Sequence, residues 1–182
     1  IVESLMQFTK TLHLNQQPVR IADIIVEAVK RISREPAFNG IDISAEKADP
    51  ALKVSADFEQ IRHALESVIR NGAEAAVRFE KDGRVSVAVC STEDTVAILV
   101  TNTGAAIPEE EQSKMFDPFF TTKRVGEGTG LGLCVAHGIV EQHNGRLFLK
   151  SSANGKTVFE LRIPMISEDP GDGAERRSKG EQ

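Results

Sequence analysis

Polar side chains capable of ligation recur at helical spacing between residues 57 and 78. One stripe of this predicted helix, opposite an apolar face, carries Gln60, Ser67, Asn71, Glu74 and Arg78. Asparagine is a poor choice in a helix interior, because its amide competes with the backbone for hydrogen bonds. An amide oxygen that faces a cavity can instead ligate Mg²⁺, which prefers oxygen. The stripe is therefore either a solvated helix face or one wall of a magnesium site.

A second candidate is the segment 100–108, Val-Thr-Asn-Thr-Gly-Ala-Ala-Ile-Pro, which leaves the end of an apolar strand and turns at Gly104. A polar group at a strand end beside a glycine turn can reach the edge of a planar base. An ordinary strand-to-loop exit is the alternative interpretation.

Three phenylalanines and two cations stand together in Phe-Asp-Pro-Phe-Phe-Thr-Thr-Lys-Arg at 116–124. Burial stabilises a large apolar side chain by about 1.5–3 kcal/mol, so Phe116, Phe119 and Phe120 should dock on the core or on a neighbouring domain. Lys123 and Arg124 are then available to phosphate.

A glycine-rich run, Gly-Glu-Gly-Thr-Gly-Leu-Gly-Leu at 126–133, leads into a helix predicted from about 130 to 143. Glycines let backbone amides approach a phosphate, and a helix N-terminus adds free N–H groups and a positive dipole end. No Gly-Lys-Ser/Thr follows, so this is not a P-loop. It does not follow a strand, so it is not a dinucleotide fingerprint. A flexible hinge is the alternative.

The order and spacing of these four segments resemble the N, G1, F and G2 boxes of the GHKL ATPase superfamily. They are most similar to the catalytic ATP-binding domain of bacterial sensor histidine kinases. Phe-Asp-Pro-Phe-Phe-Thr-Thr-Lys, Gly-Thr-Gly-Leu-Gly-Leu and the following His-Gly-Ile-Val-Glu-Gln-His-Asn-Gly-Arg carry the resemblance, which covers about residues 18–164.

The resemblance implies roles for particular residues. Asn71 would ligate Mg²⁺ on the ATP phosphates and, with Lys123, act in catalysis. Asn102 stands where the family usually has an aspartate that accepts a hydrogen bond from the adenine amino group, and an amide accepts without charge assistance. Residues 103–129 would form the mobile ATP lid. Further nucleotide-binding residues would be Glu74, Arg78, Gly104, Ala106, Ile107, Phe120, Thr122, Gly128, Thr129, Gly130, Leu131, Gly132 and Leu133.

The activity implied by the resemblance is that of a protein-histidine kinase. It would bind Mg-ATP and transfer the γ-phosphoryl group to a histidine on a separate dimerisation domain, in a homodimeric full-length protein. A response regulator receiver domain would be the downstream partner.

Two alternatives remain open. A GHKL ATPase of the gyrase, mismatch-repair or heat-shock chaperone type needs a general base one turn before Asn71. Ser67 stands there, and Glu66 lies about 140° round the helix from Asn71. A degenerate nucleotide-binding or docking module, a pseudokinase, is favoured by Asn102 and Ala106 in place of the usual Asp and Gly.

The element order predicts an α/β (α+β) two-layer sandwich, the Bergerat fold, with a mixed, largely antiparallel sheet and helices on one face. Strands are expected as sequence-adjacent pairs: 41–44 with 52–55, about 85–89 with 96–100, and 146–151 with 156–163. Residues 1–17 are expected to be the end of the dimerisation and phosphoacceptor helix, 18–166 the ATP-binding domain, and 167–182 a disordered tail or linker.

Composition excludes several function classes. The 182 residues carry 22 basic and 27 acidic side chains, a net charge of −5, which disfavours nucleic-acid binding. Tryptophan and tyrosine are absent, and no apolar run approaches the roughly 20 residues that span a bilayer. We therefore expect no membrane contact by this chain and a cytoplasmic location, including that of the cytoplasmic part of a membrane sensor. Cys90 and Cys134 are expected to be reduced and buried.

Overall fold

The computed structural model describes residues 14–80, 82–124 and 128–166. Along the chain the elements are β1 (Gln17–Arg20), α2 (Ile21–Ser33), the 3₁₀ helix η2 (Pro36–Phe38), β2 (Asp42–Ala45), β3 (Lys53–Ala56), α3 (Phe58–Phe79), β4 (Arg84–Ser91), β5 (Thr95–Thr103), α4 (Glu109–Gln112), α5 (Gly132–Gln142), β6 (Arg146–Ala153) and β7 (Lys156–Pro164).

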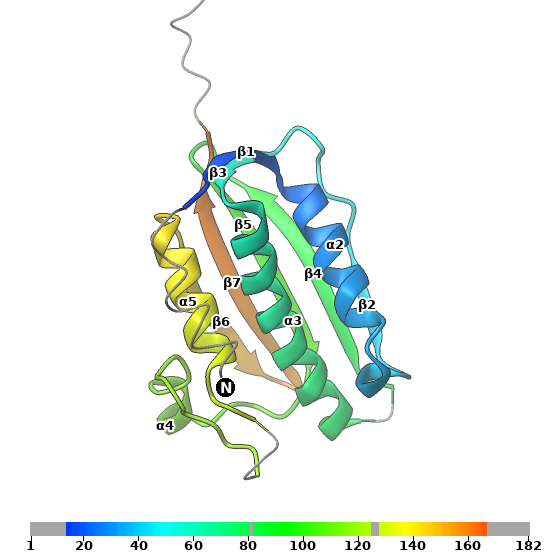
Figure 1. Ribbon diagram of the computed structural model, residues 1–182. Coiled ribbons are helices and arrows are strands. Elements are labelled where there is room, and N and C mark those ends of the chain that lie inside the picture. The colour runs from blue at the N-terminus through cyan, green and yellow to red at the C-terminus, as the bar shows by residue number, and fades with distance from the viewer. Residues whose placement is uncertain (1–13, 81, 125–127, 167–182) are drawn as a thin grey trace, which may run out of the picture.

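The main sheet has five strands in the order β2-β4-β5-β7-β6, antiparallel except for the parallel pair β2–β4. Helices α2, α3 and α5 lie side by side across one face of it (Figure 1). The predicted two-layer sandwich with a mixed, largely antiparallel sheet is confirmed. Its core is formed by the apolar stripes of the helices and the inward side chains of the strands.

The predicted pairing of residues 41–44 with 52–55 is wrong. Strand β2 pairs in parallel with β4, and β3 pairs with β1 in a separate two-stranded antiparallel sheet. Alternating apolar residues identify a strand but not its partner. Strand β1 contains Pro18, and proline is tolerated in a short ribbon at the edge of a fold. The parallel pair needs a helical crossover, and α3 supplies it.

Helix α3 begins as predicted at Asp57, whose Oδ1 accepts a hydrogen bond from the Gln60 amide at 3.2 Å. The Asp57 amide donates to Nε2 of His143 at 3.0 Å, and His143 Nδ1 lies 2.7 Å from the Ile139 carbonyl oxygen. Both ring nitrogens of this buried imidazole are therefore engaged in hydrogen bonds. The contact joins the C-terminus of α5 to the N-terminus of α3, so the two helices run antiparallel.

Helix α3 approaches the sheet most closely at Gly72. A Cβ atom at this position would lie 3.1 Å from the Cβ of Asn102 on β5. The absence of a side chain therefore lets the polar stripe of α3 lie directly above the end of β5.

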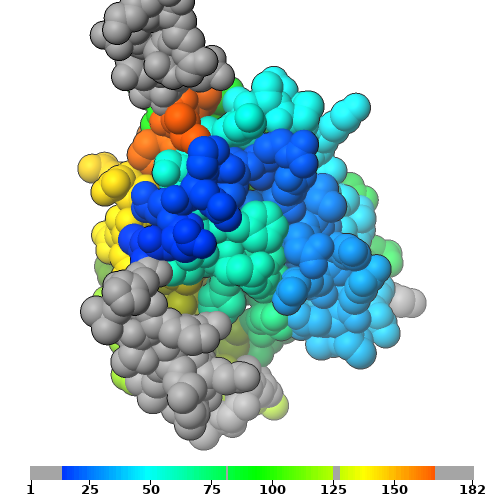
Figure 2. Space-filling view, turned by 45° about the horizontal axis from the view of Figure 1, so that its top comes forward, coloured from blue at the N-terminus to red at the C-terminus, as the bar shows by residue number. Residues whose placement is uncertain are grey.

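The residues that precede α2 cross between α5 and the start of α3 (Figure 2), where the Asn15 amide donates to Asp57 Oδ2 at 3.3 Å. Strand β1 starts at Gln17, so the part of the predicted 1–17 helix that is described is not helical. The remainder of that prediction and the predicted tail at 167–182 lie outside the described residues. No helix among the residues with described structure is long and apolar enough to cross a bilayer. Cys90 is exposed, contrary to our expectation, and Cys134 is half-buried.

Candidate functional site

A cavity of about 600 Å³ lies between α3, the turn at 105–108 and the segment that leads into α5. Most of the residues that the family resemblance implied line it: Asn71, Glu74, Arg78, Ala106, Ile107, Phe120, Thr122, Lys123, Gly128, Thr129, Gly130, Leu131, Gly132 and Leu133. The four sequence segments, far apart along the chain, thus meet around one space.

The α3 wall of the cavity is the polar stripe predicted from sequence, without Gln60. His63, Ser67, Asn71 and Glu74 follow one another at steps of four or three residues. The Ser67 hydroxyl donates to the His63 carbonyl oxygen at 3.0 Å, so it is used within the helix. We gave His63 no functional role from sequence, although its spacing of eight residues from Asn71 places it on the same helix face.

The opposite wall is the turn that contains Ala106 and Ile107. The Ile107 amide donates to Ser152 Oγ at 2.8 Å, and Gln112 Nε2 donates to the Ile107 carbonyl oxygen at 2.7 Å. Both backbone groups of Ile107 are therefore held. Positive φ angles among the described non-glycine residues occur only at Phe119, Asn144 and Asn154. Alanine is consequently unstrained at position 106.

Asn102 and Gly104 are the two implied residues that do not line the cavity. Asn102 is 3% exposed, and its Nδ2 donates to the Thr103 carbonyl oxygen at 2.8 Å. A Cβ at Gly104 would lie 3.0 Å from that Nδ2 and 3.6 Å from the Cβ of Ala75. Both residues thus lie behind the wall, beneath Ala75. Direct contact of Asn102 with a base stays a prediction.

A charged pair spans the cavity. Lys123 Nζ forms an ion pair with Glu74 Oε2, and both side chains are half-buried. The stem of Lys123 packs on Gly128, where a Cβ would come within 2.7 Å of Lys123 Cδ. The glycine therefore lets the lysine lie across the cavity, with its ammonium group beside the helix face that carries Asn71.

A backbone hydrogen bond joins the glycine-rich segment to the phenylalanine segment. The Phe119 amide donates to the Gly130 carbonyl oxygen at 3.0 Å. Gly130 has φ +65°, and a Cβ there would lie 2.4 Å from the Phe119 carbonyl carbon. Only glycine satisfies both conditions.

The three phenylalanines behave differently from one another. Phe116 packs on His137 and Phe159, with ring centroids 4.9 and 6.4 Å apart, and Phe120 lines the cavity. Phe119 is 66% exposed, so of the two expected positions it does not occupy the core of this domain, and docking on a neighbouring domain stays a prediction. Its left-handed backbone, φ 67°, turns the ring outward.

The N-terminus of α5 opens on the cavity. No side chain caps it, and a Cβ at Gly132 would meet nothing within 4 Å. The first amides of the 11-residue helix therefore face space that a ligand can occupy. Uncapped N–H groups and the positive dipole end make this an anion-binding position.

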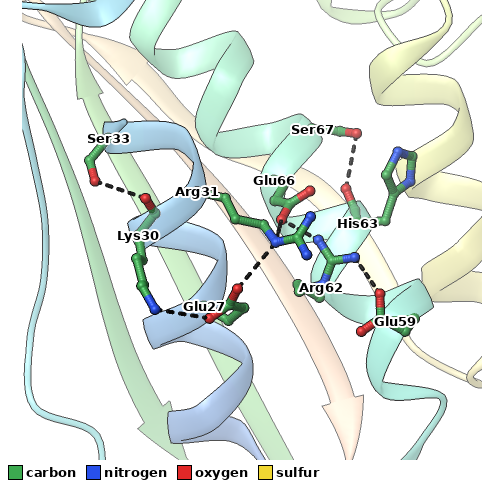
Figure 3. A network of polar contacts seen from close by, with 9 residues as sticks. All are labelled: Glu27, Lys30, Arg31, Ser33, Glu59, Arg62, His63, Glu66 and Ser67. Carbon is green, nitrogen blue, oxygen red and sulfur yellow. Dashed lines mark hydrogen bonds and ion pairs between the residues drawn. The ribbon is translucent and has the colours of Figure 1, made fainter. Parts of the chain in front are cut away.

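Acidic side chains on the other side of α3 point away from the cavity. Arg62 pairs with Glu59 and Glu66, and Arg31 of α2 lies 3.7 Å from Glu66 (Figure 3). Burial alone would lower the pKa of the Arg62 guanidinium, but its two glutamate partners outweigh burial and raise it. Glu66 thus faces away from Asn71, as its angular position predicted, and takes part in the α2–α3 contact.

The oxygen donors of the cavity suit a hard divalent cation. Asn71 offers a neutral amide oxygen and Glu74 a carboxylate on the same helix face. Within the described part of the chain, no group of three His, Cys, Asp or Glu side chains could hold a metal ion. A cation bound here would therefore complete its coordination with ligand or water oxygens.

Residues 56–167 match the family model for the histidine kinase-, DNA gyrase B-, and HSP90-like ATPase. Among curated proteins, the chain is 32% identical over 168 residues to the sensor histidine kinase ZraS of Salmonella typhimurium. It is 28% identical to the sensor kinase CckA of Brucella abortus. These alignments cover 92% and 93% of this chain but only 35% and 19% of the relatives.

Among solved structures, the nucleotide-free catalytic domain of the histidine kinase ThkA is similar, with a TM-score of 0.72 and 29% identity. The match covers 82% of this chain and 95% of that domain. ThkA in complex with the response regulator TrrA matches with a TM-score of 0.74 and 26% identity, over 92% of this chain and 47% of that one. By sequence and by structure, the chain belongs to the histidine kinase-, DNA gyrase B- and HSP90-like ATPase family.

Proposed function

We propose that this chain is the ATP-binding catalytic domain of a sensor histidine kinase. It binds Mg-ATP and donates the γ-phosphoryl group to a histidine on a separate dimerisation domain. The observation that carries the proposal is the meeting of Asn71, Lys123 and the uncapped N-terminus of α5 around one cavity. An oxygen ligand, a cation and free amides are the groups that a metal-bound polyphosphate requires.

The shape of the cavity supports an order for the bound nucleotide. The turn at 105–108 and Phe79 line one end, with Ala75 and Ile107 as apolar walls suited to a planar base. The glycine-rich segment and the start of α5 line the middle, where phosphates accept from backbone amides. Asn102 lies behind Ala75. Its amide oxygen contributes to base recognition if Ala75 moves aside when the nucleotide binds.

The residues of this chain position and neutralise the phosphates rather than react with them. Asn71 would hold Mg²⁺, which supplies charge neutralisation on the phosphate oxygens. Lys123 would exchange Glu74 for a phosphate oxygen, and the α5 amides would hold the same group from the other side. Phosphoryl transfer needs this positioning and charge compensation more than covalent help from the protein.

Hydrolysis by a GHKL ATPase is the first alternative. It requires a base beside the terminal phosphate, yet Glu66 is engaged with Arg62 and the Ser67 hydroxyl donates into the helix. The arrangement favours transfer to a supplied acceptor over attack by water. A nucleotide-binding pseudokinase is the second alternative, and only phosphoryl transfer separates it from the proposal.

The experiment has two stages. Calorimetric titration of the chain with ATP and Mg²⁺ tests binding. Incubation of the chain with radiolabelled ATP and a dimerisation domain that carries an acceptor histidine then tests transfer. Acid-labile label on the acceptor supports the kinase, free phosphate without label supports the ATPase, and binding without either product supports the pseudokinase.

The likeness to ZraS and to the ThkA–TrrA complex supports a response regulator as downstream partner. We also propose a dimerisation domain of the same protein as the phosphoacceptor, and a cytoplasmic location. The chain spans about a third of the length of ZraS, so these partners belong to the proposal for the whole protein.

A further inference from the structure

The imidazole of His63 is a titratable group of the cavity for which neither the sequence nor the proposed reaction supplies a role. The residue lies on α3 and lines the cavity. Its ring extends to the side of α3 away from α2 (Figure 3). Neither ring nitrogen hydrogen-bonds within residues 14–80, 82–124 and 128–166, and neither is buried without a partner. Both nitrogens are therefore available to a ligand.

The position of His63 along α3 indicates which part of the ligand it meets. At about 1.5 Å per residue, His63 and Phe79 lie roughly 12 Å to either side of Asn71 along the helix axis. Phe79 and Ala75 lie at the end proposed for the base, since Gly155 approaches Phe79, and Gly104, which leads into the turn at 105–108, approaches Ala75. His63 lies at the other end.

Helix α5 confirms this direction. It runs antiparallel to α3, with His143 at Asp57. Its N-terminus, 11 residues before His143, therefore lies beside the middle of α3, near Ser67 and Asn71. A triphosphate that starts at the base and passes the α5 amides continues toward His63.

We propose that His63 binds the terminal phosphate of ATP through its protonated imidazole and so discriminates ATP from ADP. This inference rests on the proposed function and names a contact that acts on the third phosphate alone.

The charges around His63 support a proton-linked contact. Its pKa lies below the usual range, chiefly because burial disfavours the cation; Glu66 raises the pKa, whereas Arg62 and Arg70 lower it. The free protein therefore holds a neutral imidazole at pH 7. A dianionic phosphate brought beside it favours the protonated form and raises its pKa.

Among the described residues, the charges that shift the pKa of His63 all lie on α3 itself. On α5, His137 Nδ1 lies 3.4 Å from Glu141, and the His137 ring packs on Phe116. On the loop side, Lys123 is paired with Glu74. The arrival of phosphate is thus the change that His63 senses.

The direction in which pH changes ATP affinity follows from the linkage between proton binding and ATP binding. A group whose pKa is higher in the complex takes up protons on binding, so ATP affinity rises as pH falls through the pKa of the complex. The gain is complete below the pKa of the free protein. One pKa unit of difference corresponds to about a tenfold change in affinity. ADP, which lacks the third phosphate, should show much less of this gain.

The test is the ratio of ATP to ADP affinity between pH 8 and pH 5.5, measured by calorimetry with Mg²⁺ on the parent chain, His63→Gln and His137→Gln. Glutamine keeps a polar side chain but cannot be protonated. His137→Gln is the matched control, because that imidazole lies outside the cavity lining. Titration of the nucleotide's own phosphates is common to all three proteins and cancels in the comparison.

We expect the ratio to rise several-fold more on acidification in the parent and in His137→Gln than in His63→Gln. Titration in buffers of different ionisation enthalpy gives a second measurement. The excess of proton uptake with ATP over that with ADP should be larger in the parent than in His63→Gln. Equal pH dependence in parent and His63→Gln would overturn the role of His63 while leaving ATP binding intact. A parent chain that binds no ATP would instead overturn the proposed function, and this inference with it.

Discussion

Lys123 is paired with Glu74 across the cavity that we propose binds ATP. The lysine comes from the segment after β5, and the glutamate lies one turn after Asn71 on α3. In the absence of an anion, the carboxylate neutralises the ammonium group and holds it beside the proposed phosphate position. A phosphate must therefore compete with Glu74 for the lysine, and the free energy of that exchange contributes to affinity.

Replacing Lys123 tests this exchange. We expect Lys123→Gln to weaken ATP binding about tenfold, roughly 1.4 kcal/mol, because the cation over the phosphates is lost. Adenosine, without phosphates, should bind parent and variant alike. Lys114→Gln is the control, since Lys114 is an exposed lysine of the same segment that does not line the cavity. An equal loss of ATP affinity in Lys123→Gln and Lys114→Gln, or no loss in either variant, would contradict a phosphate contact at Lys123.

Asn102 is suited to its site by its amide hydrogens, which the aspartate usual in the family does not have. Asn102→Asp would place a carboxylate oxygen against the Thr103 carbonyl, so the variant should lose about 1–3 kcal/mol of stability. Burial beside a carbonyl raises the pKa of the new carboxyl group in the folded state. The loss should therefore be small at low pH and grow as pH rises above the ordinary aspartate range.

Urea denaturation of parent and Asn102→Asp at pH 5 and pH 8 measures this difference. A variant as stable as the parent at pH 8 would mean that Thr103 has turned its carbonyl away. That result would also free the carboxylate to accept from a base, as the family pattern implies.

Glu160 gives the stability of the sheet a pH dependence. It lies 1% exposed on β7, between Lys150, at 2.8 Å, and Arg162. Burial raises the pKa of this carboxyl, but its two cationic partners outweigh burial and lower it. The stabilisation is thus present above the ordinary glutamate pKa and is lost as pH falls through the lowered value.

We expect Glu160→Gln to lose about 1–3 kcal/mol at pH 7 and to show a flatter stability profile below pH 5. Chemical denaturation across that range measures both. Glu109→Gln, an exposed glutamate of α4, should match the parent throughout. Parallel acid profiles for parent and Glu160→Gln would show that Glu160 is not the group responsible.

Local patterns in the sequence predicted most of the fold. The helical spacing in α3 and the pairing of β4 with β5 and of β6 with β7 each depend on nearby residues, and each was found. Pairing was harder, because the partners of β2 and β3 depend on the crossover by α3. The hydrogen bond of His143 likewise depends on a donor, the Asp57 amide, that lies 86 residues away.

The candidate site was predicted better than its details. The family resemblance implied that Asn71, Lys123 and Gly130 belong to one site, and all three line one cavity. The exposure of Phe119 could not be inferred from the sequence. It depends on a left-handed backbone conformation at Phe119, whose amide donates to the Gly130 carbonyl oxygen. The place of Asn102 behind Ala75, and that of His63 inside the cavity, arise from the packing of α3 on β5 and α5.

The central claim is that Asn71 holds the magnesium ion of a bound Mg-ATP. Calorimetric titration with ATP, with and without Mg²⁺, should be compared for the parent, Asn71→Ala and the exposed control Asn39→Ala. We predict that Mg²⁺ strengthens ATP binding by the parent and by Asn39→Ala, and has no effect on Asn71→Ala, which should unfold as cooperatively as the parent. Equal Mg²⁺-dependent affinity in the parent and Asn71→Ala would contradict the account.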